Sequence, residues 1–136
     1  IPEQMIGGSP ITYLHSKLGG WGTGGLAHLE KEALTAYEAA FTPTVITQIC
    51  DDYRASAGVD LEHDRASREQ GVKIQCDTLV LWGSHGVVHR FFDPLKLSQA
   101  QCAGVVDGQA LPCGHFLPEE QPDACISALR AFLRPA

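Results

Sequence analysis

The sequence predicts an α/β fold in which a helical amino-terminal part precedes the last strands of a parallel sheet. Residues up to about 72 show helical periodicity and loop composition. Beyond them, two strand-like segments alternate with helical segments, a pattern typical of a parallel α/β layer. Two strands alone would leave an apolar edge and face uncovered. We therefore expect the chain to be the back end of a larger α/β fold.

The amino-terminal part begins with a segment rich in glycine and proline, residues 1–25, which favours a loop with one short helix at about residues 11–18. Apolar residues then recur at three- and four-residue steps over 29–41 and predict an amphipathic helix. Thr42 and Pro43 resemble an N-cap followed by a proline in the first turn of a second helix.

Two further features belong to this helical part. Tyr53 shares one face of the second helix with apolar residues, so we expect its ring to be buried. A third, charged helix is expected from about Asp60 to Gln70, with Gly71 as its stop. A boundary between the helical part and an α/β part is expected near residue 72.

The second half contains the predicted strands. Residues 74–82 end in a continuous apolar run, which suits a strand covered on both faces, and residues 83–86 follow as a loop. Asp93-Pro94 opens a helix to about Ala103. A second strand is expected over 105–111. A loop then leads into one final amphipathic helix that starts near Pro118.

Composition excludes several function classes. The chain has 136 residues and a net charge of -6, and aromatic residues do not interleave with its scattered basic ones, so we expect no nucleic-acid partner. Neither a membrane-length apolar run nor a secretory segment is visible, and we expect no membrane partner. Five cysteines without a CxxC pair favour a reducing compartment, and hence a cytoplasmic location. No phosphate-binding loop is present, and we expect no cofactor.

His115 is the leading candidate for a chemical role. It stands between Gly114 and Phe116, in a tight loop between a predicted strand and a predicted helix. Rigid elements on both sides would hold the imidazole while letting it face a cleft, as a general base requires. Ligand sites of α/β sheets collect at the carboxyl ends of strands. The alternative is a loop histidine that merely bonds to backbone.

The other titratable residues give weaker signals. Asp77, Asp93 and Asp107 are candidate acid partners for the histidine, whereas Glu119 and Glu120 are expected to complement the start of the final helix.

The remaining histidines suggest no metal centre. His85 and His89 are four residues apart but lack a third ligand, so we expect no metal site. Three further histidines are expected at the surface: His15, His28 and His63.

The nucleophile that such a base would activate is not apparent. The 136 residues contain neither a G-x-S-x-G nor a G-x-D-x-G elbow. The glycine cluster around Trp21 does not match one either. A histidine base without an elbow points to an amino-terminal half outside this chain.

Several motifs together resemble the carboxyl-terminal half of a haloacetate (fluoroacetate) dehalogenase of the α/β-hydrolase superfamily. They are Cys50-Asp51-Asp52-Tyr53-Arg54-Ala55, Glu62-His63-Asp64, Leu81-Trp82-Gly83 and the segment from Gly114 to Glu120. The resemblance covers nearly the whole chain. It implies the end of a helical cap domain over 1–56, a helix returning to the core over 57–72, and the carboxyl-terminal part of the hydrolase core over 73–136.

The resemblance also implies residue roles. His115 would activate the water that hydrolyses an aspartyl ester, Tyr53 would hydrogen-bond the departing halide, and Trp21 would lie near the substrate channel. The expected substrate is a small haloacid, and the nucleophile and its acid partner would come from the other half of the fold. Two alternatives stay open: an epoxide hydrolase or other ester hydrolase, and an inert fragment or self-associating module, in which a homodimer covers the sheet edge.

Overall fold

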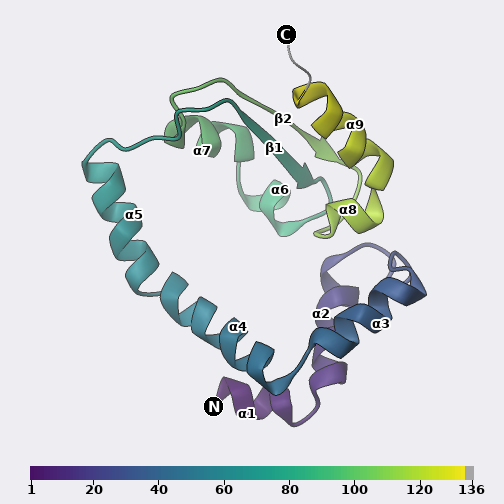
Figure 1. Cartoon of the computed structure of the whole chain (residues 1–136). Helices are drawn as coiled ribbons and strands as arrows, with labels where there is room; N and C mark the ends of the chain where they lie inside the picture. Colours follow the sequence, from purple (N-terminus) through teal and green to yellow (C-terminus); the bar gives the residue numbers. More distant parts are fainter. Residues whose placement is uncertain (134–136) are drawn as a thin grey trace. The chain divides into compact units, whose positions relative to one another are not determined.

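A computed structural model describes residues 1–133 (Figure 1). The chain forms two compact units. One unit contains residues 1–18 and 29–72, and the other contains residues 19–28 and the chain from Lys73 onward. The last three residues of the expected core range, 134–136, lie outside the described residues.

The first unit is helical, as predicted. Its helices are α1 (Pro2–Gly7), most of α2 (Pro10–Trp21), α3 (Lys31–Ala40), α4 (Pro43–Ser56) and α5 (Val59–Glu69). Its buried cluster consists of Ile6 from α1 together with Ile46 and Cys50 from α4, and the rings of Tyr13 and Phe41 pack around it.

The amino-terminal segment is more helical than its composition suggests, since α1 was not predicted and α2 continues past residue 18. A six-residue helix is marginal by itself, so its stability must come from packing. Ile6 is buried against α4, and Glu3 pairs with Arg54. The Thr42 cap is confirmed, because its hydroxyl accepts a hydrogen bond from the Val45 amide at 3.3 Å.

The expected burial of Tyr53 is wrong: the residue is 63% exposed. The buried cluster includes Ile46 and Cys50 from earlier turns of α4 and does not extend to the last turn. The helical face is therefore apolar where the sequence predicts it, but only its first part is covered within this unit. At the end of α5, Gly71 has φ +67°, which confirms the predicted glycine stop.

The second unit contains the predicted parallel sheet. Its elements are β1 (Thr78–Gly83), α6 (Val87–Phe91), α7 (Pro94–Gln101), β2 (Val106–Leu111), α8 (Leu117–Glu120) and α9 (Pro122–Phe132). β1 and β2 pair in parallel, from Thr78 opposite Val106 to Gly83 opposite Leu111. β1 begins later than predicted, because Ile74 makes only an isolated bridge to Cys102.

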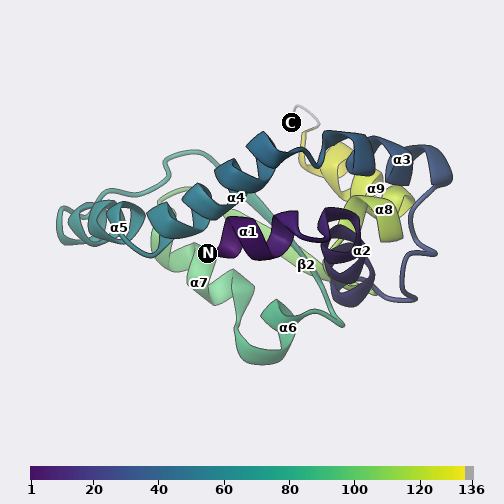
Figure 2. The same ribbon diagram turned by 90° about the horizontal axis from the view of Figure 1, so that it is seen from below.

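Helices contact the sheet from both sides: α6 and α7 lie on one side and α9 on the other (Figures 1 and 2). The predicted Asp93 cap of α7 is confirmed, since its carboxylate accepts from the Lys96 amide at 3.1 Å. Two features of this unit differ from the prediction. The sequence does not predict the short helix α6, and the segment predicted as one final helix forms two helices, α8 and α9.

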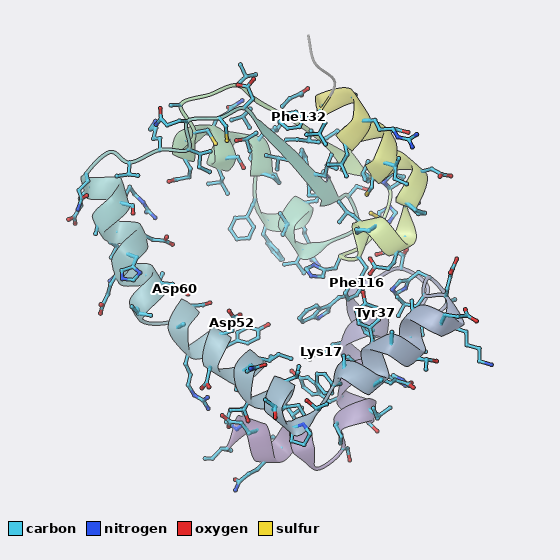
Figure 3. All side chains as sticks on the ribbon, viewed as in Figure 1. Lys17, Tyr37, Asp52, Asp60, Phe116 and Phe132 are labelled. Carbon is cyan, nitrogen blue, oxygen red and sulfur yellow. The ribbon has the colours of Figure 1, made fainter. Side chains whose placement is uncertain are left out.

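Pro122 separates α8 from α9. Its ring supplies no N–H and disfavours helical backbone at the preceding residue, and Gln121 adopts φ -140° and ψ 56°. α9 then runs to Phe132, which is labelled in Figure 3.

Apolar surface remains exposed in this unit, as we expect of a sheet with only two strands. Val87, Val88, Phe91 and Phe92 of the α6 region are 45% to 68% exposed. Among the described residues, no helix combines the length and apolar character needed to cross a bilayer.

Candidate active site

Three segments of the second unit meet at the carboxyl ends of the two strands. They are the loop after β1, the loop after β2, and the end of α2 with the turn that follows it. The Ser84 amide donates to the Leu111 carbonyl at 2.8 Å, and the His85 amide donates to the Cys113 carbonyl at 3.0 Å. These bonds fasten the first two loops to each other, at the edge of the sheet where ligand sites form.

Two glycines make this close approach possible. A Cβ atom on Gly114 would lie 2.6 Å from the Trp21 carbonyl oxygen and 2.8 Å from the Gly22 Cα. A Cβ atom on Gly83 would collide with the Gly114 carbonyl. The residue before His115 must therefore be glycine because backbone crosses directly over it.

His115 is exposed, and its backbone is fixed. Its amide donates to the Trp21 carbonyl at 2.9 Å. Its ring meets Trp21 and Phe116 edge-on, with centroid distances of 5.2 and 5.1 Å (Phe116 is labelled in Figure 3). Within residues 1–133 no side chain hydrogen-bonds the ring nitrogens. The imidazole is thus oriented by packing and free to act on a bound molecule.

The imidazole faces a pocket of about 700 Å³ that lies entirely in this unit. Its walls are mainly apolar and come from all three segments. They include Trp21, Trp82, His85, Val88 and Leu117. Trp21 lines this pocket beside His115.

Glu120 of α8 joins two of these backbone segments around the histidine. One carboxylate oxygen accepts from the Gly114 amide at 2.9 Å, from the Thr23 amide at 2.9 Å and from the Thr23 hydroxyl at 2.5 Å. The other oxygen accepts from the Phe116 amide at 3.1 Å. The carboxylate therefore bonds to the residues on either side of His115 and to the turn after Trp21.

The pKa of Glu120 reflects this arrangement. Burial acts to raise it, but the hydrogen bonds from Thr23, Gly114 and Phe116 outweigh burial and lower the pKa from 4.5 to about 2. The group is consequently ionised at any pH at which a hydrolase works. The sequence predicts only that Glu120 complements the start of a helix, and the residue does lie in the first turn of α8. The proximity of the His115 loop could be foreseen, but the bond to a turn 97 residues away could not.

The three candidate acid partners of His115 are each occupied elsewhere. Asp77 accepts from the Val105 amide, Asp93 caps α7, and Asp107 accepts from the amide of the next residue. None of these three carboxylates hydrogen-bonds the imidazole. The carboxylates instead satisfy backbone amides at strand and helix starts.

Three of the other histidines, His15, His28 and His89, contact neighbouring side chains. His89 Nδ1 accepts from the Trp82 indole N–H at 3.0 Å, and His15 pairs with Glu38 at 2.7 Å. His28 is not a simple surface residue, because its ring stacks on Phe116 and its two nitrogens are buried without a partner among the described residues. Residues 1–133 contain no cluster of three His, Cys, Asp or Glu side chains able to hold a metal ion.

The thiol nearest to His115 in sequence is a poor nucleophile. Cys113 is fully buried, in a cluster with Leu111 and Cys125. Burial raises the pKa of the Cys113 thiol, and the Glu120 charge raises it further. The thiolate is the reactive form, so this environment disfavours attack.

Tyr53 lies on α4 in the first unit, and its side chain is open to solvent. The neighbouring Arg54 is used structurally, since it pairs with Asp51 at 2.7 Å and with Glu3 of α1. The structure brings Trp21 and His115 together within one unit and leaves Tyr53 on the other.

Comparison with known proteins identifies relatives along the whole chain, although no family model matches it. A fluoroacetate dehalogenase from Burkholderia sp is 35% identical, over 99% of this chain and 44% of its own length. A proposed alpha/beta hydrolase from Nostoc sp PCC 7120 is 42% identical, with TM-score 0.93, over 100% of this chain and 46% of that one.

A proposed epoxide hydrolase from Pseudomonas aeruginosa, in a variant structure with bound MFA, is 35% identical with TM-score 0.88. The match covers 97% of this chain and 44% of the chain of that relative. The chain thus spans less than half the length of these relatives. The chain has the fold of the carboxyl-terminal part of an α/β hydrolase, and its sequence resembles the carboxyl-terminal half of a fluoroacetate dehalogenase.

Proposed function

We propose that this chain supplies the hydrolytic base of a haloacid dehalogenase, with fluoroacetate-like short haloacids as substrates. The observation that carries the proposal is the setting of His115. Its backbone is fixed, its ring faces a mainly apolar pocket, and its nitrogens are unengaged within residues 1–133. The 35% identity to a fluoroacetate dehalogenase supports the substrate class.

The reaction has two steps. A carboxylate oxygen, from an aspartate in the amino-terminal half that we propose completes the fold, forms a bond to the halogen-bearing carbon. The carbon–halogen bond breaks, and the halide leaves with both electrons. In the second step water gives a proton to His115 while its oxygen adds to the ester carbonyl carbon. The ester C–O bond then breaks, and the proton goes to the departing hydroxy acid.

Tyr53 is proposed to donate its hydroxyl to the departing halide. Strong carbon–halogen bonds break readily only where the developing halide charge meets preorganised donors in a site that excludes water. Tyr53 is 63% exposed in this unit, so the role requires that the proposed amino-terminal half covers it and excludes water. Trp21 is proposed to line the path to His115, because its ring packs against the imidazole.

Halide release tests the proposal. The full-length protein that carries this chain is assayed for halide release from fluoroacetate and chloroacetate, and His115→Ala is compared with His63→Ala, which removes an imidazole from α5. Continuous release by wild type and His63→Ala, but not by His115→Ala, is expected. Release that continues in His115→Ala at the wild-type rate would contradict the assignment of the base.

An epoxide hydrolase is the second candidate, favoured by the Pseudomonas relative. In that reaction Tyr53 would protonate the epoxide oxygen instead of holding a halide. A small epoxide tested in the same assay series separates the two. Diol formation without any halide release from haloacids would favour the epoxide hydrolase.

A further inference from the structure

One charged side chain in the second unit has no part in the proposed chemistry and yet makes four hydrogen bonds beside the base. Glu120 accepts from the Gly114 and Phe116 amides, which flank His115, and from both donors of Thr23. No hydrogen bond joins it to the imidazole itself. Its contacts are with the backbone that carries the imidazole.

These contacts close a small framework. The His115 amide donates to the Trp21 carbonyl, and Gly114 packs directly on Trp21 and Gly22. Glu120 bonds the same two segments from α8, through Gly114 and Thr23. The histidine loop is thus tied to the turn after Trp21 both at its own backbone and through the carboxylate. The backbone segments that carry the imidazole and the Trp21 ring are therefore fastened to each other.

From this geometry we propose that Glu120 is a positioning residue, which fixes both His115 and Trp21 relative to the pocket by holding the backbone of their two loops. The inference rests on the proposed role of His115 as base. A carboxylate suits the task because every partner is a donor. An amide in its place would turn an NH₂ group toward N–H donors and could accept only through its single oxygen.

The consequence for catalysis is specific to one step. Attack by the nucleophile does not use His115, whereas ester hydrolysis does. Loosening the loop should therefore slow hydrolysis and spare the first step. A displacement of about 1 Å can cost on the order of 100-fold in rate, so we expect Glu120→Gln to lower kcat about 10- to 100-fold. KM should fall by a similar factor, so that kcat/KM, which reports the first step, should change little.

The experiment uses the full-length protein and rapid-mixing halide release. Glu120→Gln should keep a first-turnover burst of halide and lose steady-state rate. Glu119→Gln, which removes the same charge one residue earlier on α8, should retain both. Thr23→Val should show a smaller loss of kcat, and Thr23→Ser should restore it, because serine keeps the hydroxyl bonded to Glu120. Two results would overturn the inference. One is a burst amplitude of Glu120→Gln that falls in parallel with its steady-state rate, and the other is a kcat of Glu120→Gln within about twofold of that of Glu119→Gln.

Backbone amide exchange separates this inference from the proposed function. If wild type releases no halide, the proposed reaction fails, but the framework is still tested by the Thr23, Gly114 and Phe116 amides. Bonds to a charged acceptor are strong enough that their loss should speed exchange about tenfold or more in Glu120→Gln. Unchanged exchange at all three amides would overturn the positioning role whatever the activity.

Discussion

Gly114→Ala tests the packing that places His115. The added Cβ would lie 2.6 Å from the Trp21 carbonyl oxygen, about 0.8 Å inside the 3.4 Å at which ordinary contact begins. The three atoms nearest to this Cβ belong to the backbone of Trp21 and Gly22, so no flexible side chain can move aside. The same carbonyl accepts the His115 amide, and pushing it away stretches that bond as well.

The expected cost combines two effects. Overpacking of this kind costs about 1–3 kcal/mol, and a weakened backbone hydrogen bond adds about 1 kcal/mol. We therefore expect Gly114→Ala to lower the free energy of unfolding by about 2–4 kcal/mol in urea titrations. The control is Gly20→Ala in the same unit. Gly20 is helical with no atom near its would-be Cβ, so alanine should stabilise by up to about 1 kcal/mol. A Gly114→Ala stability within about 0.5 kcal/mol of wild type would refute the reasoning.

Three further predictions concern the two units separately. Tyr53→Phe should reduce fluoride release by about 10- to 100-fold and chloride release by less, because fluoride depends most on hydrogen bonds; equal losses in both assays would favour a packing role. Glu120 has a folded pKa near 2 against an ordinary 4.5, so its contribution is complete above pH 4.5 and is lost as pH falls toward 2. At neutral pH we expect wild type to exceed Glu120→Gln in free energy of unfolding by about 1–2 kcal/mol, a value discounted for solvent screening. This difference should shrink as the pH falls from 4.5 toward 2. A difference that does not depend on pH would argue against the hydrogen bonds to the Glu120 carboxylate. Thr42→Ala should cost about 1 kcal/mol in the same titration, since it removes the cap of α4, and no loss would mean that the cap is formed otherwise.

The elements that the sequence predicts well have strong local signals. The structure contains both predicted strands, the caps at Thr42 and Asp93, and the glycine stop at Gly71. Each depends on residues within one turn or one strand. The parallel pairing follows from the alternation of strand and helix.

The missed elements depend on tertiary contacts. α1 is short and is held by Ile6 against α4, and α6 is only five residues long. The sequence predicts a buried Tyr53, but the residue is exposed. Helical periodicity identifies an apolar face of a helix and does not show which element covers that face. Pro122 could have indicated the break between α8 and α9, because proline commonly begins a helix.

The candidate site was predictable only in part. His115 stands out because a glycine and a strand precede it and a helix follows. The role of Glu120 depends on Thr23, far away in the sequence, and on a close backbone crossing at Gly114 that no local pattern reveals. The occupation of the candidate aspartates by backbone amides was equally invisible in the sequence.

The account's central claim is that His115 activates the water that hydrolyses a covalent ester. The most direct test is the intact mass of full-length His115→Ala after incubation with fluoroacetate. We predict one ester adduct per protein and one equivalent of fluoride, with no further release. Continued fluoride release without an adduct, or neither fluoride nor adduct where wild type turns over, would contradict the claim.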